Sequence, residues 1–162
     1  MNNTVHKCSE CGKQFKKDKL YLIDKTYICT GCMYGNEKPF KIYPIGVIIN
    51  NLKRNPVGFG VVGSDKVSRI EIIASQKPFM YRLEDEKELT IIYYLHKAGH
   101  IKSIFHRGLD GKKTGLFATR TPDRLSGIAV QNARLLKIEG TALFVEGLDA
   151  INGSPVLDIR IL

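Results

Sequence analysis

The sequence predicts a mainly β protein: a small closed or nearly closed β-barrel preceded by a four-cysteine zinc-ribbon module. Two C-x2-C pairs lie near the N-terminus. The rest of the chain consists of short apolar, β-branched segments separated by turn residues, with hardly any helical periodicity. The sequence contains neither a strand–GxGxxG–helix unit nor a Walker-type glycine–lysine loop, which disfavours a Rossmann or P-loop nucleotide site.

The metal prediction rests on the spacing of the cysteines. Seventeen residues separate the two pairs, which is typical of four thiolates that bind one zinc ion. Two disulfides or four unrelated thiols are the alternatives, and the absence of a secretory signal argues against disulfides. Four thiolates fill the coordination sphere, so we expect a structural zinc. The ligands would be Cys8, Cys11, Cys29 and Cys32.

The barrel prediction rests on a series of strand-like segments after a linker at 35–39. Residues 1–38 are expected to form the zinc-ribbon module and residues 39–162 the barrel domain. A short apolar strand at 115–118 is expected to end in a polar turn, because Pro122 removes a donor. Residues 77–87 could hold one short helix. The other expected strands are 42–49, 67–74, 88–95, 100–105, 128–138, 141–146 and 156–162, with a hairpin turn at Glu139-Gly140.

Charge and composition point to a class of partner. Lysine and arginine total 25 against 16 acidic residues, and the resulting net charge of +9 favours a polyanion, most obviously nucleic acid. No apolar run approaches the roughly 18 residues of a membrane helix, so no membrane partner is expected. The N-terminus lacks the apolar core of a signal peptide, which predicts a cytoplasmic protein.

Four ordered blocks carry a resemblance to a known family. They are YPIGVI at 43–48, the strand that ends in YLHK at 94–97, GLFATRTPDR at 115–124 and GLDAINGSPVLDIRI at 147–161. Together they resemble the TsaA-like, or TrmO, family of tRNA methyltransferases over about residues 42–162. The resemblance implies a small β-barrel enzyme that uses S-adenosylmethionine without a Rossmann domain. It also implies a homodimer that methylates N6 of threonylcarbamoyladenosine next to the anticodon in tRNA.

The resemblance also suggests site residues, of which the cofactor contacts are carried over by matching position. Arg120 and Arg124 flank the polar turn, and an arginine fork suits a carboxylate or a phosphate. Candidates for a general base are His96, Tyr94 and His100. Cofactor contacts are expected at His96, Lys97, Arg120, Val130, Gly147, Leu148 and Asp149. RNA contacts are expected at Arg107, Lys112, Lys113 and Arg124.

Two departures from the family pattern leave other functions open. The segment Leu125 to Ala129 lacks the asparagine and prolines that the family has there, and the loop Lys53 to Gly63 lacks its Pro-Arg-Gln tripeptide. One alternative is a methyltransferase of the same fold with a different acceptor. The other is a non-catalytic adaptor that uses its zinc ribbon to bind RNA or protein.

Overall fold

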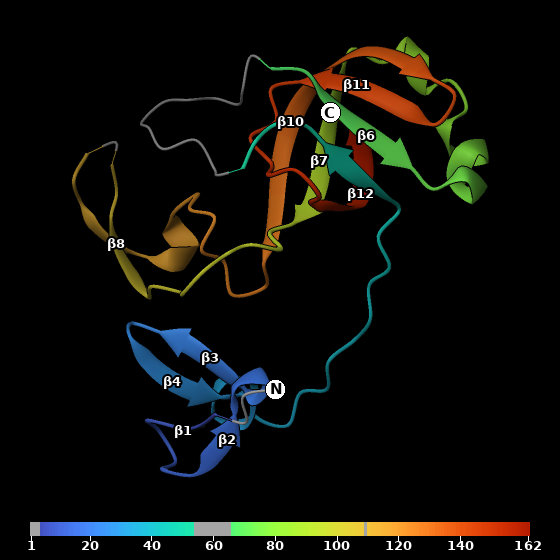
Figure 1. The fold of residues 1–162 in the computed structure, drawn as a ribbon. Coiled ribbons are helices and arrows are strands. Elements are labelled where there is room, and N and C mark those ends of the chain that lie inside the picture. The colour runs from blue at the N-terminus through green and yellow to red at the C-terminus, as the bar shows by residue number, and fades with distance from the viewer. Residues whose placement is uncertain (1–3, 54–65, 109) are drawn as a thin grey trace. The chain divides into compact units, whose positions relative to one another are not determined.

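The structure is a computed structural model that describes residues 4–53, 66–108 and 110–162 (Figure 1). The chain divides into two compact units. The ribbon unit combines Met1–Lys41 with Ala98–Leu125, and the barrel unit combines Ile42–Lys97 with Ser126–Leu162. Residues 98–125 therefore pack with the N-terminal segment, although they lie within the stretch expected to form the barrel domain. Most of the loop Lys53 to Gly63 lies outside the described residues.

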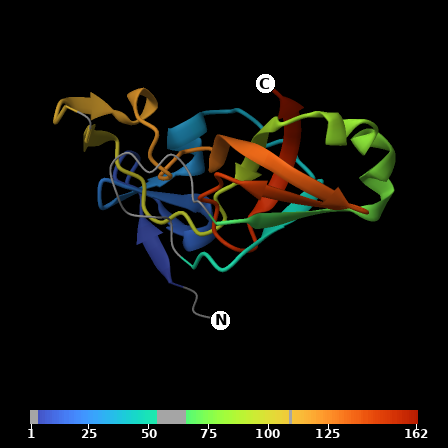
Figure 2. The ribbon, with the colours of Figure 1, turned by 90° about the horizontal axis from the view of Figure 1, so that it is seen from above.

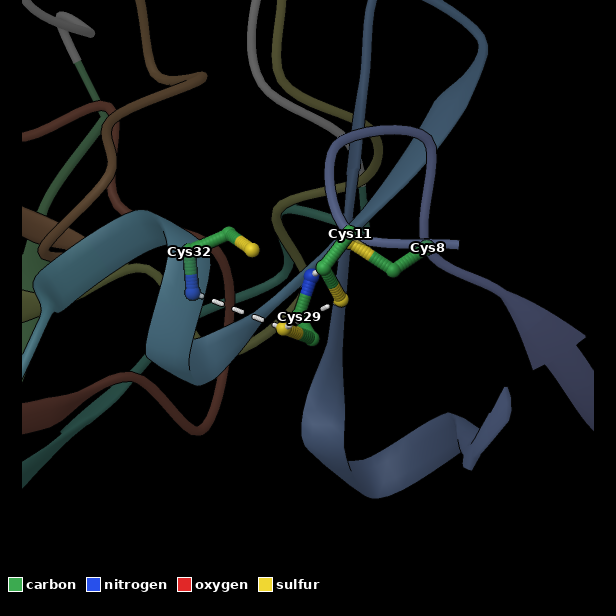
Figure 3. A group of neighbouring side chains, drawn as sticks. All are labelled: Cys8, Cys11, Cys29 and Cys32. Carbon is green, nitrogen blue, oxygen red and sulfur yellow. Dashed lines mark hydrogen bonds between the residues drawn. The ribbon is translucent and has the colours of Figure 1, made fainter. Parts of the chain in front are cut away.

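The N-terminal half of the ribbon unit is built from two small hairpins. One hairpin lies between the two cysteine pairs, and the first pair lies in the turn of the preceding hairpin. All four cysteines point into one cluster (Figure 3). The elements are β1 (Val5–Lys7), β2 (Gln14–Lys16), the 3-10 helix η1 (Lys17–Lys19), β3 (Leu20–Ile23), β4 (Thr26–Cys29) and α1 (Thr30–Tyr34).

The second half of the ribbon unit is the 98–125 segment. It contains the hairpin of β8 (Ile104–His106) and β9 (Lys113–Gly115), followed by the 3-10 helix η4 (Leu116–Ala118). The prediction of a strand at 115–118 is therefore wrong beyond its first residue, because Gly115 ends β9 and Leu116–Ala118 form η4. The carbonyl of Leu116 accepts hydrogen bonds from the backbone N–H and the hydroxyl of Thr119, which turns the chain before a strand can form.

The barrel unit is a closed barrel of six antiparallel strands, in the order β10-β11-β6-β5-β12-β7 (Figures 1 and 2). The expected fold class is confirmed. Closure leaves each strand paired on both sides, which removes sheet edges. The strands are β5 (Gly46–Ile49), β6 (Ser68–Ile72), β7 (Glu88–Tyr94), β10 (Ile128–Glu139), β11 (Ala142–Glu146) and β12 (Pro155–Ile161).

Most expected strands are found, with shifted ends. The hairpin turn at Glu139-Gly140 is confirmed, because Glu139 of β10 pairs with Ala142 of β11. Strand β5 begins only at Gly46, and the preceding Pro44 cannot donate to a sheet. Of the segment 100–105, only its end lies in β8, and Ile101 forms an isolated bridge with Ile23.

One end of the barrel is covered by 3-10 helices. The single helix expected at 77–87 is instead η2 (Ala74–Met80), which contains Pro78, and η3 (Leu83–Asp85). Both lie near the turn between β10 and β11 (Figure 2). Met80 and Leu83 pack against the buried cluster. No helix in the described parts of the chain has the length and apolarity that a bilayer crossing requires.

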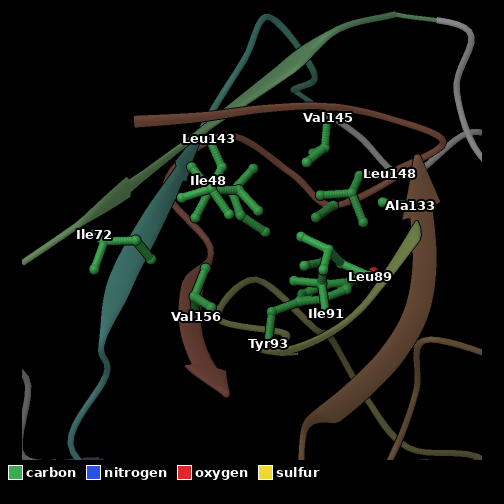
Figure 4. Packing of buried hydrophobic residues seen from close by; sticks show 12 residues of the cluster. Ile48, Ile72, Leu89, Ile91, Tyr93, Ala133, Leu143, Val145, Leu148 and Val156 are labelled. Carbon is green, nitrogen blue, oxygen red and sulfur yellow. The ribbon is translucent and has the colours of Figure 1, made fainter. Parts of the chain in front are cut away.

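The barrel core is formed by side chains that point inward from every strand (Figure 4). In strand β7, Leu89, Ile91 and Tyr93 are buried, whereas Tyr94 is exposed. Side chains that are fully buried include Ile48, Ile70, Leu143, Val145, Leu148 and Val156. Burial of this kind contributes about 1.5–3 kcal/mol per large aliphatic side chain.

We expect Gly46→Ala to destabilise the barrel by about 1–3 kcal/mol. A Cβ at Gly46 would lie 2.4 Å from the backbone oxygen of Glu71, so β5 and β6 would have to move apart. Urea denaturation measures the loss. The matched control is Gly115→Ala, where φ is −72° and a Cβ would have no neighbour within 4 Å. Equal stability of the two variants would contradict this reading of the β5–β6 contact.

Candidate functional site

Six strand ends and the loop between β11 and β12 meet at one end of the barrel, which we call the loop end. Because every neighbouring pair is antiparallel, β5, β7 and β11 end there, and β6, β10 and β12 begin there. Residues 147–154 connect β11 to β12 and hydrogen bond to several of these strands. The loop end therefore collects polar groups from segments far apart in sequence.

Gln131 of β10 holds the start of this connecting loop. Its Nε2 donates to the carbonyl of Gly147 at 2.8 Å, and its Oε1 accepts from the backbone N–H of Asp149 at 3.2 Å. Gly147 has a φ of 100°, a conformation that favours glycine. The Tyr93 hydroxyl lies 3.1 Å from Asp149 Oδ1, to which it donates. These contacts orient the Asp149 carboxylate.

The Tyr93 hydroxyl is a buried phenol next to a carboxylate. Burial is the main cause that raises its pKa, and the negative charge of Asp149 and its hydrogen bond raise it further. The phenol therefore stays protonated and remains a donor at neutral pH. Among the described residues, Asp149 Oδ2 has no protein donor, so one oxygen of this half-buried carboxylate can accept a hydrogen bond from a ligand.

Asn50 ties the end of β5 to its surroundings. Its Nδ2 donates to the buried hydroxyl of Ser68 at 3.0 Å and to the carbonyl of Ala150 at 2.9 Å. Its backbone N–H donates to Asn152 Oδ1, and its own Oδ1 accepts from the N–H of Leu52. The Asn50 side chain thus fixes the middle of the connecting loop. Both ends of its amide group have hydrogen-bond partners, as polar groups removed from water require.

His96 lies just beyond β7 with its ring held in one tautomer. The Ser154 hydroxyl donates its only hydrogen to the carbonyl of Ile151 at 2.7 Å. The contact of 3.3 Å between Ser154 Oγ and His96 Nδ1 then requires Nδ1–H as the donor. This leaves Nε2 as the acceptor nitrogen. Nε2 lies beside Gly153, which has a φ of 84° and carries no side chain to cover the ring.

The other expected residues of the barrel unit lie in different surroundings. Tyr94 is exposed and its ring lies against Gly127, where a Cβ would come within 2.5 Å of the ring. Lys97 and Val130 are exposed. Leu148 is fully buried in the core, so only its backbone could contact a ligand. Val130 and Gln131 are neighbours in β10 and point to opposite faces.

Arg120 and Arg124 of the ribbon unit differ in their surroundings. Arg120 is exposed, and its side chain has no hydrogen-bond or ion-pair partner among the described residues. Arg124 donates from Nη1 to the carbonyls of Leu116 and Thr119, at 3.0 and 2.9 Å, and lies over the ring of Phe117. Arg124 therefore holds the turn that presents Arg120, while the Arg120 fork remains available to a ligand.

Three of the four expected RNA contacts, Arg107, Lys112 and Lys113, lie at or beside the β8–β9 turn. Arg107 forms an ion pair with Asp110, and this interaction lowers the pKa of the carboxyl to about 2. Lys112 lies 3.9 Å from the same carboxylate. Lys113 of β9 is exposed, as is His100 in the preceding segment. Arg107 is thus partly neutralised by Asp110, whereas Lys113 is free of acidic partners in the described structure.

The four cysteines form a cluster whose sulfur atoms all lie within 4.8 Å of one another (Figure 3). They are free thiols. Tetrahedral coordination with zinc–sulfur bonds of about 2.3 Å places neighbouring sulfurs about 3.8 Å apart. The sulfurs of Cys11 and Cys29 lie 3.9 Å apart, and backbone N–H groups point at the sulfurs of Cys8 and Cys29. The residues present therefore fit one zinc ion.

The thiols of the cluster influence one another's protonation. The backbone N–H of Cys11 is the main cause that lowers the pKa of Cys8 to about 6. The contact with the Cys29 side chain is the main cause that raises the pKa of Cys32 to about 12. Without a metal, the four thiols therefore share few negative charges, and a zinc ion would remove the remaining protons.

A family model matches residues 50–161, which is more than half of the chain. Its description is "tRNA-methyltransferase O N-terminal domain". The chain belongs to the TrmO N-terminal-domain family. The expected family membership is confirmed, together with a four-cysteine cluster consistent with a zinc module. The matched residues include the whole loop end as described above, apart from its first strand.

Relatives of two kinds support this assignment. A tRNA (adenine(37)-N6)-methyltransferase of Mus musculus is 41% identical over 81 residues, which cover 48% of this chain and 19% of that protein. An S-adenosyl-L-methionine-binding protein of Archaeoglobus fulgidus is 31% identical over 118 residues, covering 72% of this chain and 85% of that protein. The chain thus spans about a fifth of the length of the mammalian relative.

The fold is also shared with a solved TrmO structure. The crystal structure of TrmO from Pseudomonas aeruginosa superposes with a TM-score of 0.60 at 23% identity, covering 77% of this chain and 56% of that one. A protein described as binding S-adenosylmethionine is thus among the relatives of this chain. The Asp149 carboxylate, with an oxygen free of protein donors, and the glycine at 147 fit a ligand with hydroxyl or amine donors.

Several residues of the loop end were not expected from the sequence. They are Tyr93, Gln131, Asn50 and Ser154, all of which position the expected residues. One signal was present: Gln131 and Asn132 interrupt an otherwise apolar start of a strand. A polar residue at an inward strand position would have pointed to a polar cluster at this end of the barrel.

We expect Tyr93→Phe to change how stability depends on pH. The folded state raises the pKa of the Tyr93 phenol, so it binds this proton more tightly than the unfolded chain does. The wild type should therefore lose stability as pH rises above about 10, the ordinary pKa of tyrosine. At pH 8 the variant should be less stable by about 0.5–1.5 kcal/mol, because one hydrogen bond is lost.

Urea unfolding at pH 8 and near pH 11 measures both effects. The deficit of Tyr93→Phe should shrink at the higher pH. The matched control is Tyr81→Phe, since the Tyr81 side chain is 85% exposed. A deficit that stays constant between the two pH values would show that the buried phenol is not the titrating group.

Proposed function

We propose that this protein is an S-adenosylmethionine-dependent methyltransferase that methylates N6 of threonylcarbamoyladenosine next to the anticodon in tRNA. The observation that carries the proposal is the oriented Asp149 carboxylate at the loop end of a TrmO-family barrel. The proposal takes its reaction from the mammalian relative and its cofactor from the archaeal one. It includes a cytoplasmic homodimer, as the family resemblance implies.

The cofactor-binding residues would be drawn mainly from the loop end. Asp149 Oδ2 would accept from a ribose hydroxyl pair or the amino group, and the backbone at Gly147 would allow close approach. Lys97, Val130 and the backbone of Leu148 would complete this set. Arg120 would bind a carboxylate through its fork. When bound, S-adenosylmethionine supplies the methyl group and the leaving group, so the protein has mainly to bind and orient.

His96 is the best-placed candidate for a general base. The acceptor nitrogen of threonylcarbamoyladenosine is amide-like and a poor nucleophile, so removal of its proton would help. Nε2 of His96 is the nitrogen that can accept this proton, because Ser154 holds the other one as a donor. Tyr94 lacks a comparable fixed acceptor, and among the described residues no hydrogen bond fixes the tautomer of His100. Ser154 would thus act through His96 as a positioning residue.

Zinc is proposed as a structural ion of the ribbon unit. The four thiolates leave no open position, so the ion would hold the two hairpins together and would not take part in catalysis. A module of this size has little core of its own, and metal binding would supply much of its folding free energy.

Cofactor binding and nucleoside analysis test the proposed function. Calorimetry should detect S-adenosylmethionine binding, and incubation with tRNA that contains threonylcarbamoyladenosine should add one methyl group to that nucleoside by mass analysis. Binding without methyl transfer to this nucleoside would favour the alternative of a different acceptor. No heat and no thermal shift at millimolar cofactor would leave the adaptor function.

Purified protein should contain close to one equivalent of zinc, because four clustered thiolates saturate a tetrahedral ion. Metal analysis of the purified protein measures this. Cys29→Ser should lower the zinc content and unfold the N-terminal segment before the barrel, as followed by hydrogen exchange. Metal-free protein with an ordered N-terminal segment would contradict the zinc assignment.

Arg120→Ala should weaken ligand binding by about 1.5–3 kcal/mol, the scale of a hydrogen bond to a charged group. Arg120→Lys should not restore binding, since lysine lacks the planar fork. Titrations with S-adenosylmethionine and with tRNA measure the loss, and circular dichroism checks that the fold is unchanged. The control is Arg160→Ala, which removes an exposed barrel arginine. Wild-type affinity of Arg120→Ala for both ligands would assign Arg120 to the solvated surface.

A further inference from the structure

The net charge of the protein is concentrated in one of its two units. The ribbon unit has 14 lysines and arginines against 6 aspartates and glutamates, hence +8. The barrel unit has 11 against 10, hence +1. A zinc ion with four thiolates would carry −2, which would leave the ribbon unit at +6. Two segments that are distant in sequence thus combine nearly all of the excess positive charge.

The positive charges of the ribbon unit are also largely uncompensated. In the barrel unit, Arg69, Arg82, Arg134, Lys137 and Arg160 each form an ion pair with a nearby acid. In the N-terminal part of the ribbon unit, no lysine of the described residues forms an ion pair, and all are exposed. These lysines are Lys7, Lys13, Lys16, Lys17, Lys19, Lys25, Lys38 and Lys41.

The first hairpin of the ribbon directs its lysines to one side. In the β1–β2 register, His6 lies opposite Phe15, and Lys7 lies opposite Gln14. Since neighbouring residues of a strand point to opposite faces, His6 and Phe15 share one face and Lys7 and Lys16 share the other. His6 stacks on Tyr27 at 4.2 Å. The lysine face is therefore the outer one, directed away from this packing.

The 98–125 segment presents a second positive face. In the β8–β9 register, His106 lies opposite Lys113, and both are exposed. Lys102 precedes this hairpin and is also exposed. Phe117, which follows β9, is 77% exposed and lies near the Arg124 guanidinium. An exposed aromatic ring on a positively charged surface suits the stacking of an unpaired base.

Asp24 joins the two halves of the ribbon unit. Its carboxylate accepts from the backbone N–H of Ser103 at 3.0 Å and from the Ser103 hydroxyl, and its own N–H donates to the carbonyl of Ile101. The N–H of Ile101 in turn donates to the carbonyl of Leu22. Asp24 has a φ of 45°, in the turn between β3 and β4. The turn of the zinc ribbon is thus bonded to the start of the second segment.

Further hydrogen bonds extend from this junction toward Arg120, which is expected to bind a ligand. The carbonyl of Ser103 accepts from the N–H of Leu116, and the carbonyl of Leu116 accepts from Arg124. Arg124 also holds the carbonyl of Thr119, the residue before Arg120. A continuous set of hydrogen bonds therefore runs from the turn of the zinc ribbon to Thr119, the residue before Arg120.

We propose that the ribbon unit is one RNA-docking unit, in which the zinc ribbon binds the phosphate backbone and, through Asp24, positions the 98–125 segment against an unpaired loop of the same RNA. The proposal rests on the proposed function for the identity of the RNA as tRNA. Exposed lysines without acidic partners supply the phosphate contacts, and Phe117 supplies a stacking surface. A lipid surface would use the charge alone, whereas an RNA loop would use the ring as well.

Matched charge changes test the phosphate contacts. Binding of total tRNA is measured without S-adenosylmethionine across a series of salt concentrations. The variants Lys7→Gln/Lys16→Gln and Lys102→Gln/Lys113→Gln each remove two charges from the ribbon unit. Each should reduce the slope of log K against log salt by about 1.4 and the affinity at 0.1 M salt by roughly tenfold or more, at about 0.7 per phosphate contact for single strands.

The control is Lys77→Gln/Lys87→Gln, which removes the same charge from exposed lysines of the barrel unit. Its slope should match the wild type. An equal effect of the control pair, or wild-type binding by the Lys7→Gln/Lys16→Gln pair, would overturn the proposal. Because these measurements need no cofactor, they succeed or fail independently of methyl transfer.

Asp24→Ala tests whether the two halves act together. This change makes the protein more positive by one charge, so a purely electrostatic surface would bind tRNA more tightly. The composite unit predicts weaker binding, about tenfold, because the 98–125 segment is released. Ser103→Ala should act in the same direction without a change in charge. Zinc content must stay at the wild-type level in both variants. Tighter binding by Asp24→Ala would overturn the composite unit.

Phe117→Ala and lipid vesicles distinguish RNA from other polyanions. Phe117→Ala should weaken binding to an anticodon stem-loop at least several-fold and leave binding to a fully paired RNA duplex unchanged. Vesicles that contain phosphatidylserine should bind more weakly than tRNA at the same salt. Equal or tighter binding to the vesicles, or no effect of Phe117→Ala on the stem-loop, would contradict an RNA loop as the partner.

Discussion

The hydrogen-bonded pairing of β7 on both of its edges is the interaction on which the barrel depends. Strand β7 pairs with β10 along its whole length and with β12 on the other side, and this pairing closes the sheet. Closure turns Leu89, Ile91 and Tyr93 toward a common interior. Tyr93 is the last of these inward residues, and its position brings the phenol to the Asp149 carboxylate. The polar groups of the loop end are therefore placed by the strand that also closes the core.

The parts of the fold that the sequence predicted are those determined by local pattern. The strand at 88–95, the hairpin at Glu139-Gly140 and the paired cysteines each depend on residues close together in the chain. The residues that orient the site depend on distant partners. Ser154 contacts His96 across 58 positions, and Asp24 contacts Ser103 across 79. No spacing within a short window reveals such pairs.

The wrong strand prediction at 115–118 also arises because local pattern does not reveal the contacts that decide the structure. Its apolar residues suit a strand by propensity alone. Hydrogen bonds from Thr119 and Arg124 to the Leu116 carbonyl instead turn the chain into a 3-10 helix. In the sequence, Arg124 was expected to contact RNA, and in the structure its side chain also organises the backbone before Arg120. An arginine whose chemistry suits a ligand can thus instead hold the backbone beside another arginine, as Arg124 does beside Arg120.

The 98–125 segment leaves and rejoins the barrel at adjacent positions of one β-ladder. The N–H of Leu95, just after β7, donates to the carbonyl of Gly127, just before β10. Topologically the segment is the connection of a β-hairpin whose stem is already closed. Lengthening such a connection costs little, since loop-closure entropy grows only with the logarithm of length. The barrel can therefore tolerate the exchange of this whole connection, because the β7–β10 pairing that closes its stem stays unchanged.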